Sequence, residues 1–210
     1  MNKISYSQLE SARNNPKVFA NTLKSGGNPI RFKKPPKFTI WKNSIFDYHK
    51  KKNNLPEAIN YFQNSFFKHY ANNRKNVIER DNWVNEIQNY AQDEIKRKLT
   101  FCDKKVRTNI DLTNKLKLGG ELPLIKMNYK GGYSVYFFSR ENTLWENELR
   151  FPIIQNYVAS TLYGVDLSDV EVGVYSLVQK KHLQKIFTQR EIDEAEKELK
   201  AIGKVVSLAL

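Results

Sequence analysis

Large apolar residues recur every three or four positions through much of the first half of the chain. This spacing runs from Trp41 to Leu99 and is the period of one buried helix face. Asn53-Asn54-Leu55-Pro56 interrupts it, because asparagine caps helices and proline is favoured in their first turn. The pattern predicts a shorter helix before this interruption and longer helical stretches after it, with the aromatic side chains used for packing.

Two short helices are predicted nearer the start. Ser5 to Gln8 has the form of a capping box, so a helix is expected from Tyr6. Asn15-Pro16 predicts a second helix that ends near Leu23. Residues 30–39 are basic and contain adjacent prolines, which exclude a regular helix, so we expect an extended crossing segment there.

After Thr100 the apolar period changes to the alternation of β-strands. Four segments are predicted as strands: 106–112, 116–127, 133–138 and 170–178. A helix is expected from Pro152 to Leu162, or from an earlier start at the capping box of Thr143 to Glu146 with Pro152 as a kink. A capping box at Thr188 predicts a last helix. The order predicts an α+β fold with an α/β core, in which a helical N-terminal half precedes a small mixed β-sheet flanked by helices.

The composition indicates a single globular domain that comprises residues 1–210. Residues 1–100 are expected to be mostly helical and basic, and residues 101–210 are expected to form a sheet core with two helices. No apolar run approaches the about 18 residues of a membrane span, and the start lacks the apolar stretch of a signal peptide. The single cysteine, Cys102, excludes an internal disulfide and a Cys-based zinc or iron–sulfur site. We expect a cytoplasmic protein of a bacterial or virus-infected cell, without a cofactor.

Positive charge is concentrated in the first half. Residues 1–118 carry 24 Lys and Arg against 10 Asp and Glu, a net +14, whereas residues 119–210 carry 11 against 12, a net −1. This asymmetry favours a nucleic acid or an acidic partner on one side, although a chain rich in Lys and Asn also fits a simply soluble surface. The clusters expected to contact phosphates are Arg31, Lys33, Lys34, Lys37, Lys50, Lys51, Lys52, Lys96, Arg97, Lys98, Lys104, Lys105 and Arg107.

Segments near both ends of the chain carry a recognisable pattern. The chain opens with Ile4-Ser-Tyr-Ser-Gln-Leu9, followed by Asn15-Pro16. Later, Leu149 to Gly164 and Val170 to Leu177 are followed by Phe187-Thr188 and the last predicted helix. Together these segments resemble the RecB/AddB-type branch of the PD-(D/E)XK nuclease superfamily. The resemblance implies a restriction-endonuclease-like fold and, in active members, metal-dependent cleavage of DNA.

The residues that the resemblance would assign to catalysis are missing. The family's first-strand aspartate falls on Pro123, and its acid-x-lysine triplet falls within Tyr136 to Arg140, where Arg140 alone is ionisable. Its cysteine before proline is Asn15 and its helix glutamine is Ile153, although Tyr157 remains. Mg²⁺ and Mn²⁺ require oxygen ligands, so we assign no catalytic and no metal-binding residue.

The acidic residues that remain do not favour a metal site that has moved to another position. The triplets Glu94-Ile-Lys96 and Glu198-Leu-Lys200 lie in predicted helices, where residues two apart do not share a face. Glu121 is placed to face the former site, with Glu141 or Glu148 as the nearest second acid. A relocated metal site at these three carboxylates therefore stays open as an alternative.

The other candidate motifs give no catalytic centre. Gly119-Gly120 and Gly131-Gly132 read as turns rather than as a phosphate-binding loop. None of the histidines has a nucleophile in a recognisable motif, with His49 and His69 on helices and His182 in a loop. The former site is expected to be a closed apolar centre lined by Pro123, Phe137 and Phe138.

Three hypotheses follow from the sequence. The first is a catalytically inactive nuclease-fold protein that binds nucleic acid, DNA rather than RNA, as a subunit of a larger complex and away from membranes. The second is a structural or assembly subunit, for example of a virus or phage, which uses the fold for protein docking. The third is a divergent metal-dependent DNA nuclease that uses Glu121.

Overall fold

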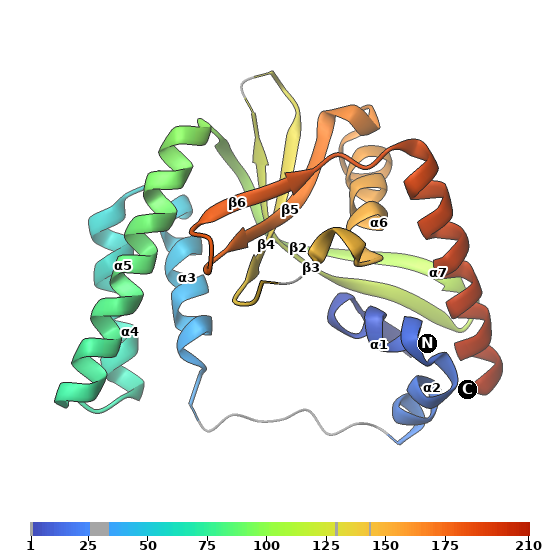
Figure 1. Ribbon diagram of the computed structural model, residues 1–210, viewed down its shortest axis with the longest axis horizontal. Helices are drawn as coiled ribbons and strands as arrows, with labels where there is room; N and C mark the ends of the chain where they lie inside the picture. The colour runs from blue at the N-terminus through green and yellow to red at the C-terminus, as the bar shows by residue number, and fades with distance from the viewer. Residues whose placement is uncertain (1, 26–33, 129, 143) are drawn as a thin grey trace.

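The computed structural model describes residues 2–25, 34–128, 130–142 and 144–210. Helices cover both faces of one six-stranded sheet, which gives three layers (Figure 1). The helices are α1 (Leu9–Asn14), α2 (Pro16–Lys24), α3 (Lys37–Lys50), α4 (Leu55–His69), α5 (Arg74–Arg97), α6 (Arg150–Tyr157), which continues as a π-helix over Val158–Tyr163, and α7 (Gln189–Ala209). The strands are β1 (Asn2–Ser5), β2 (Thr100–Thr113), β3 (Leu116–Met127), β4 (Tyr133–Ser139), β5 (Val170–Ser176) and β6 (Lys181–Lys185).

The sheet forks along one edge of β3. Antiparallel β2 pairs with β3 along its whole length. On the other edge, parallel β1 pairs with Leu116 to Gly119, and antiparallel β4 pairs with Leu124 to Met127. Within the described part of the chain, residues 120–123 therefore have no strand partner on that edge, and we call this position the fork. Parallel β5 and antiparallel β6 extend the sheet beyond β4.

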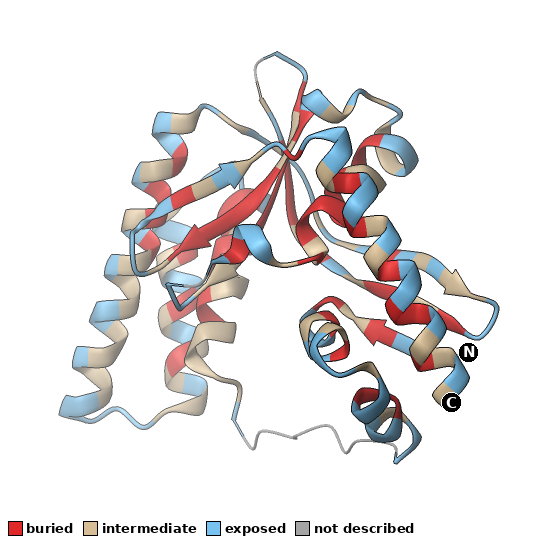
Figure 2. Cartoon of the chain, turned by 45° about the vertical axis from the view of Figure 1, so that its right-hand side comes forward, coloured by how far each residue is buried: buried red, intermediate tan, exposed pale blue. Residues whose placement is uncertain are grey.

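Two hydrophobic clusters hold the layers together. The first lies between the sheet and α1, α2, α6 and α7, and contains Ile4 and Phe151. The second lies between the sheet and α3, α4 and α5, and contains Trp41 and Phe62. Figure 2 shows the buried positions concentrated along the central strands and the inward faces of the helices. Because α1 and α2 contact α7, the beginning of the chain packs beside its last helix (Figure 1).

The side chains of β3 change sides at Pro123. Leu122 belongs to the first cluster and Leu124 to the second, although alternate residues of a regular strand share a face. Lys105 lies opposite Pro123 in the ladder with β2 and has a left-handed φ of 57°. Since proline donates no hydrogen bond to a ladder, Pro123 and Lys105 together mark a kink where the long β2–β3 ribbon passes from one core to the other.

The predicted fold class is confirmed, because a helical N-terminal half precedes a mixed sheet flanked by helices. The capping boxes at Ser5 and Thr188 both form. Asn54 caps α4, with proline in the first turn, and left-handed Gly164 ends the segment that follows α6. The four predicted strands are also present, with β2 beginning earlier than predicted, at Thr100.

Several local predictions are wrong. The segment expected to be extended, residues 30–39, contains the first turn of α3 from Lys37, and its residues 30–33 lie outside the described residues. Strands β1 and β6 were not predicted, and β6 carries His182, which was expected in a loop. Gly119 and Gly120 lie inside β3 rather than in a turn. A side chain at Gly120 would meet the Tyr6 ring at 2.3 Å, so glycine there allows Tyr6 to pack against the strand.

Candidate nucleic-acid interface

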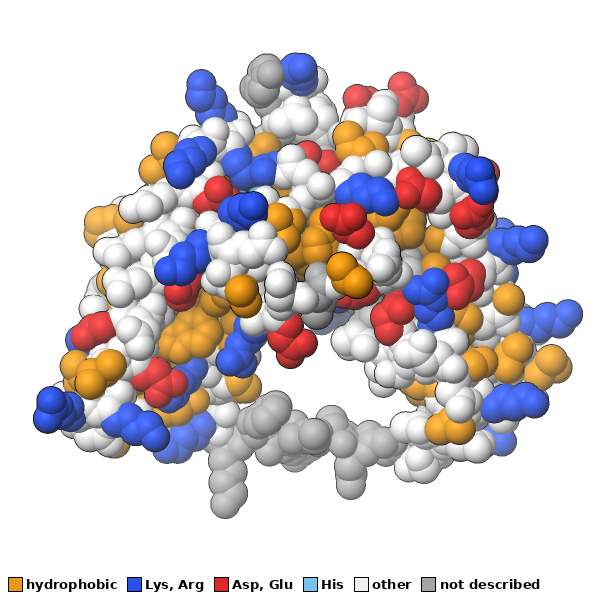
Figure 3. All heavy atoms as spheres, viewed as in Figure 1, with side chains coloured by type: hydrophobic (Ala, Val, Ile, Leu, Met, Phe, Trp, Pro, Cys, Tyr) orange, Lys and Arg blue, Asp and Glu red, His pale blue; other side chains and the backbone are white. Residues whose placement is uncertain are grey.

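A pocket of about 380 Å³ opens at the fork of the sheet. Its floor contains Gly120 and Pro123 of β3 and Phe137 of β4. Residues before α1, including Tyr6, form one wall, and residues of α3, including Thr39, form another. In the space-filling view a hollow lies between the lobe of α3, α4 and α5 and the lobe of α1, α2 and α7 (Figure 3). We call this cavity the fork pocket.

Basic groups dominate the charge of the fork pocket. Lys42, Lys105 and Arg150 line it against one carboxylate, that of Glu121. Burial lowers the pKa of Lys42, while Glu121 acts to raise it and Lys105 to lower it. The hydroxyl groups of the wall come from Ser5, Ser7 and Thr39. A partly desolvated set of cations with hydroxyl donors is suited to bind an anion such as a phosphate.

Arg150 is held in place by an aromatic floor. Its guanidinium carbon lies 5.0 Å from the centre of the Phe137 ring and 4.8 Å from that of Phe151. Its Nε also lies 2.7 Å from a carboxylate oxygen of Glu148. Glu148 thus offsets part of the charge of Arg150, so Lys42 and Lys105 are the cations of the pocket with least compensation.

A basic track leads away from the fork pocket between α3 and β2. Burial lowers the pKa of Lys104, and repulsion from Lys50 and Lys105 adds to this effect. The ring of Phe46 lies beneath the track, with its centre 5.9 Å from the Lys104 nitrogen and 5.1 Å from that of Lys105. The sequence-predicted cations that the structure brings together are therefore Lys50, Lys104 and Lys105.

The other predicted cations do not gather at this site. Three of them form ion pairs with neighbouring acids: Lys37 with Glu79, Lys51 with Glu57, and Arg97 with Glu171. Five are not among the residues that line the pocket, although the last of them is paired with Glu121 in the β2–β3 ladder: Lys34, Lys52, Lys96, Lys98 and Arg107. Arg31 and Lys33 lie outside the described residues. Sequence reasoning missed Lys42 and Arg150, since neither belongs to a run of basic residues and only the fork brings them together.

The former site is not the closed apolar centre that the sequence suggested. Pro123 and Phe137 do face the same space, but that space is the fork pocket with its lysines. Phe138 points to the other face of the sheet, where its ring centre is 5.1 Å from that of Trp41. The expectation fails because the strand alternation of β4 separates Phe137 from Phe138.

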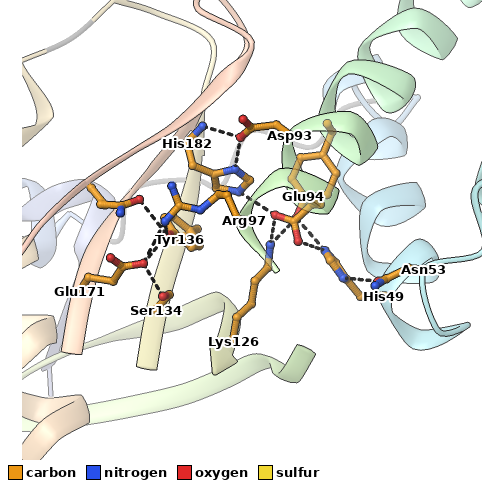
Figure 4. A network of polar contacts seen from close by, with 12 residues as sticks. His49, Asn53, Asp93, Glu94, Arg97, Lys126, Ser134, Tyr136, Glu171 and His182 are labelled. Carbon is orange, nitrogen blue, oxygen red and sulfur yellow. Dashed lines mark hydrogen bonds and ion pairs between the residues drawn. The ribbon is translucent and has the colours of Figure 1, made fainter. Parts of the chain in front are cut away.

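A second polar cluster is buried between the sheet and helices α3 and α5 (Figure 4). Lys126 of β3 has no exposed surface, pairs with Glu94 of α5, and donates a hydrogen bond of 2.8 Å to the hydroxyl of Tyr90. His182 of β6 lies 2.6 Å from Asp93 through Nδ1 and 3.1 Å from Glu94 through Nε2. These contacts connect α5 to both the centre and the far edge of the sheet.

Burial and neighbouring charges shift the pKa values of the ionisable groups in this cluster. Burial lowers the pKa of Lys126 to about 8, against the attraction of Glu94. Burial also lowers the pKa of His182 to about 4, against its hydrogen bond to Asp93. The pKa of His49, on α3, is lowered well below its usual value by burial and by Lys126. The cluster contacts none of the fork-pocket cations, and its geometry serves the attachment of α3 and α5 to the sheet.

The remaining carboxylates do not assemble a metal centre within the described ranges. No group of three or more His, Cys, Asp or Glu there is arranged to hold a metal ion. Glu121 lines the fork pocket, whereas Glu148 is paired with Arg150. The triplet of Glu94 and Lys96 lies in α5 as predicted, with the glutamate buried and the lysine exposed.

No family model matches the chain, and no curated protein matches its sequence. Among the helices in the described ranges, none combines the length and apolar character required to cross a bilayer. The functional interpretation therefore depends on the fork pocket and its surroundings.

Proposed function

We propose that this chain is a catalytically inactive nuclease-fold protein that binds nucleic acid at the fork pocket, as a subunit of a larger complex. The single observation that carries the proposal is the composition of the pocket. Lys42, Lys105 and Arg150 surround it with one opposing carboxylate, and hydroxyl groups complete its wall. Such contacts bind the phosphate backbone and do not read sequence.

The order of elements supports the nuclease-like part of the proposal. A helix precedes three antiparallel strands, β2, β3 and β4, and a further helix leads to β5, which is parallel to β4. Pro123, where the resemblance expects the first metal-binding acid, and Phe137, within the segment where it expects the second, line one pocket. Neither side chain can hold a hard cation, so this site would retain the substrate-binding surface without the hydrolytic chemistry.

A titration at several salt concentrations tests the binding. A labelled oligonucleotide should bind at low salt, and log K should fall with log salt by about 0.7 per phosphate contact for a single strand and about 0.9 for a duplex. The double variant Lys42→Gln/Lys105→Gln should weaken binding by about tenfold per lysine, because each removes a charge-assisted contact. It should also reduce the salt slope.

The matched control is Lys197→Gln/Lys204→Gln, which removes the same charge from exposed positions of α7. If both double variants weaken binding equally, the interaction is a general effect of net charge and the pocket has no special part in it. Absence of binding at low salt, together with a protein partner that co-purifies without nucleic acid, would favour the assembly hypothesis.

A cleavage assay separates this proposal from a divergent nuclease. With Mg²⁺ or Mn²⁺ present, we expect the oligonucleotide to remain intact, because Glu121 lines the fork pocket with no second acid beside it in the lining. Cleavage by the wild type that is lost in Glu121→Ala would overturn the proposal and identify Glu121 as a metal ligand.

A further inference from the structure

A small slot lies between α5 and the segments that follow β4 and β5. It has a volume of about 210 Å³ and is lined by Trp83, Leu177 and Val178, with Arg140 at its edge. Ordinary small-molecule sites measure about 300–1,000 Å³, so this slot has room for a single planar ring rather than for a larger ligand. Val178 is 56% exposed, which leaves an apolar surface open to solvent.

Phe38 connects the slot to the cations of the fork pocket. Its ring is stacked on buried Trp41, and its centre lies 6.4 Å from that of Trp83. Lys42 of the fork pocket and Arg140 of the slot approach the same Phe38 ring, at 5.3 Å and 5.6 Å from its centre. One short strand of nucleic acid therefore can reach both sites at once.

The charges of the two sites suit different parts of a nucleotide. The fork pocket carries three cations against one acid, which favours phosphate. The lining of the slot holds one cation, Arg140, and one acid, Glu86, which lies 3.9 Å from the Lys180 nitrogen, so the slot is less positively charged than the fork pocket. Its indole and guanidinium planes instead match the faces of a base, and Asn82 and Glu86 offer polar groups to base edges.

We propose that the slot binds one unpaired base of a single-stranded nucleic acid whose phosphates lie in the fork pocket. This inference rests on the proposed function, since it requires the phosphates to be held by Lys42 and Lys105. A base within a duplex is already stacked between its neighbours, so only a single strand or an unpaired end can present the base to Trp83.

The test compares an intact single strand with a strand of the same length that carries abasic sites, by fluorescence anisotropy at low salt. The intact strand should bind the wild-type protein about 5- to 100-fold more tightly, which is the usual effect of one stacked base. Trp83→Leu should remove this difference and leave the abasic strand and the salt slope unchanged, whereas Trp83→Phe, which keeps a ring, should restore much of it.

Tyr61→Leu is the matched control, because Tyr61 is an aromatic residue of α4 that is 39% exposed and lies outside the slot. Equal affinity of the wild type for intact and abasic strands would overturn the inference, whether or not Trp83→Leu folds. If neither strand binds at low salt, the proposed function itself fails. If both bind equally and Lys42→Gln/Lys105→Gln weakens both, the protein contacts phosphates alone.

Discussion

Lys126 is a lysine without exposed surface, and its charge depends on a few neighbours. It pairs with Glu94 and donates to Tyr90, while Arg97 acts to lower its pKa. Removing one member of a buried pair leaves the other charge uncompensated, which typically costs about 3–5 kcal/mol. We expect Lys126→Met to lower the free energy of unfolding in urea by about this amount.

Exposed Lys96, two residues after Glu94 and on a different face of α5, provides the control, and Lys96→Met should change stability by no more than about 0.5 kcal/mol. The double variant Lys126→Met/Glu94→Leu should be less destabilised than the sum of the single variants, because it removes both charges. Additive effects would show that the two side chains do not interact.

His49 makes stability depend on pH. Its Nδ1 lies 3.0 Å from Oδ1, the side-chain amide oxygen of Asn53, and its Nε2 lies 2.7 Å from the Tyr90 hydroxyl. This arrangement fits a neutral ring, in which one nitrogen donates and the other accepts. Since folding lowers the pKa of His49 below 6.5, the unfolded chain binds a proton first as the pH falls. The contribution of neutral His49 to the free energy of unfolding is complete above about pH 6.5. Below that pH the contribution declines, by up to about 1.4 kcal/mol per pH unit.

Urea unfolding between pH 7 and pH 5 measures this slope. His49→Gln should flatten it without abolishing it, because the lowered pKa of His182 acts in the same direction. The same substitution at His69, the partly exposed last residue of α4, serves as the control. An identical slope in wild type and His49→Gln would contradict the assignment of a neutral, desolvated His49.

At the scale of secondary-structure elements, the fork depends on how closely Tyr6 approaches β3. The Tyr6 hydroxyl is 2.6 Å from that of Thr108, and the Cβ of an alanine at position 120 would lie 2.3 Å from the Tyr6 ring. Gly120→Ala should therefore displace Tyr6 and cost about 1–3 kcal/mol of unfolding free energy. In a Tyr6→Ala background the same change should cost much less, and an undiminished cost would exclude the steric explanation.

The elements that the sequence predicted are those whose signals are local. The capping boxes at Ser5 and Thr188 and the proline in the first turn of α4 determine helix starts from neighbouring residues alone. Strand β1 has four residues and is recognisable only by its pairing with β3, more than 100 residues later in the chain. The fork pocket was unpredictable for the same reason, since Lys42, Lys105 and Arg150 meet only after β1 and β4 have paired with β3.

At the scale of the whole molecule, the fork pocket exists only when the helical half is docked on the sheet. Its walls come from the segment before α1, from α3, from β2 to β4 and from the start of α6. The buried cluster of Glu94 and Lys126 attaches α5 of the same helical lobe to the sheet. A ligand in the pocket contacts parts that separate on unfolding, so it binds the folded chain and stabilises it as a unit.

This coupling predicts a thermal shift. A single-stranded oligonucleotide at about 100 times its Kd should add about 2.7 kcal/mol to the stability of the folded state. For a chain of this size that corresponds to a rise in Tm of about 5–10 °C, measured at low salt. Lys42→Gln/Lys105→Gln at the same oligonucleotide concentration should lose most of the shift, whereas Lys197→Gln/Lys204→Gln should keep it. If the oligonucleotide binds without any rise in Tm, it binds the unfolded chain as well as the folded one, and the binding site is not the fork pocket.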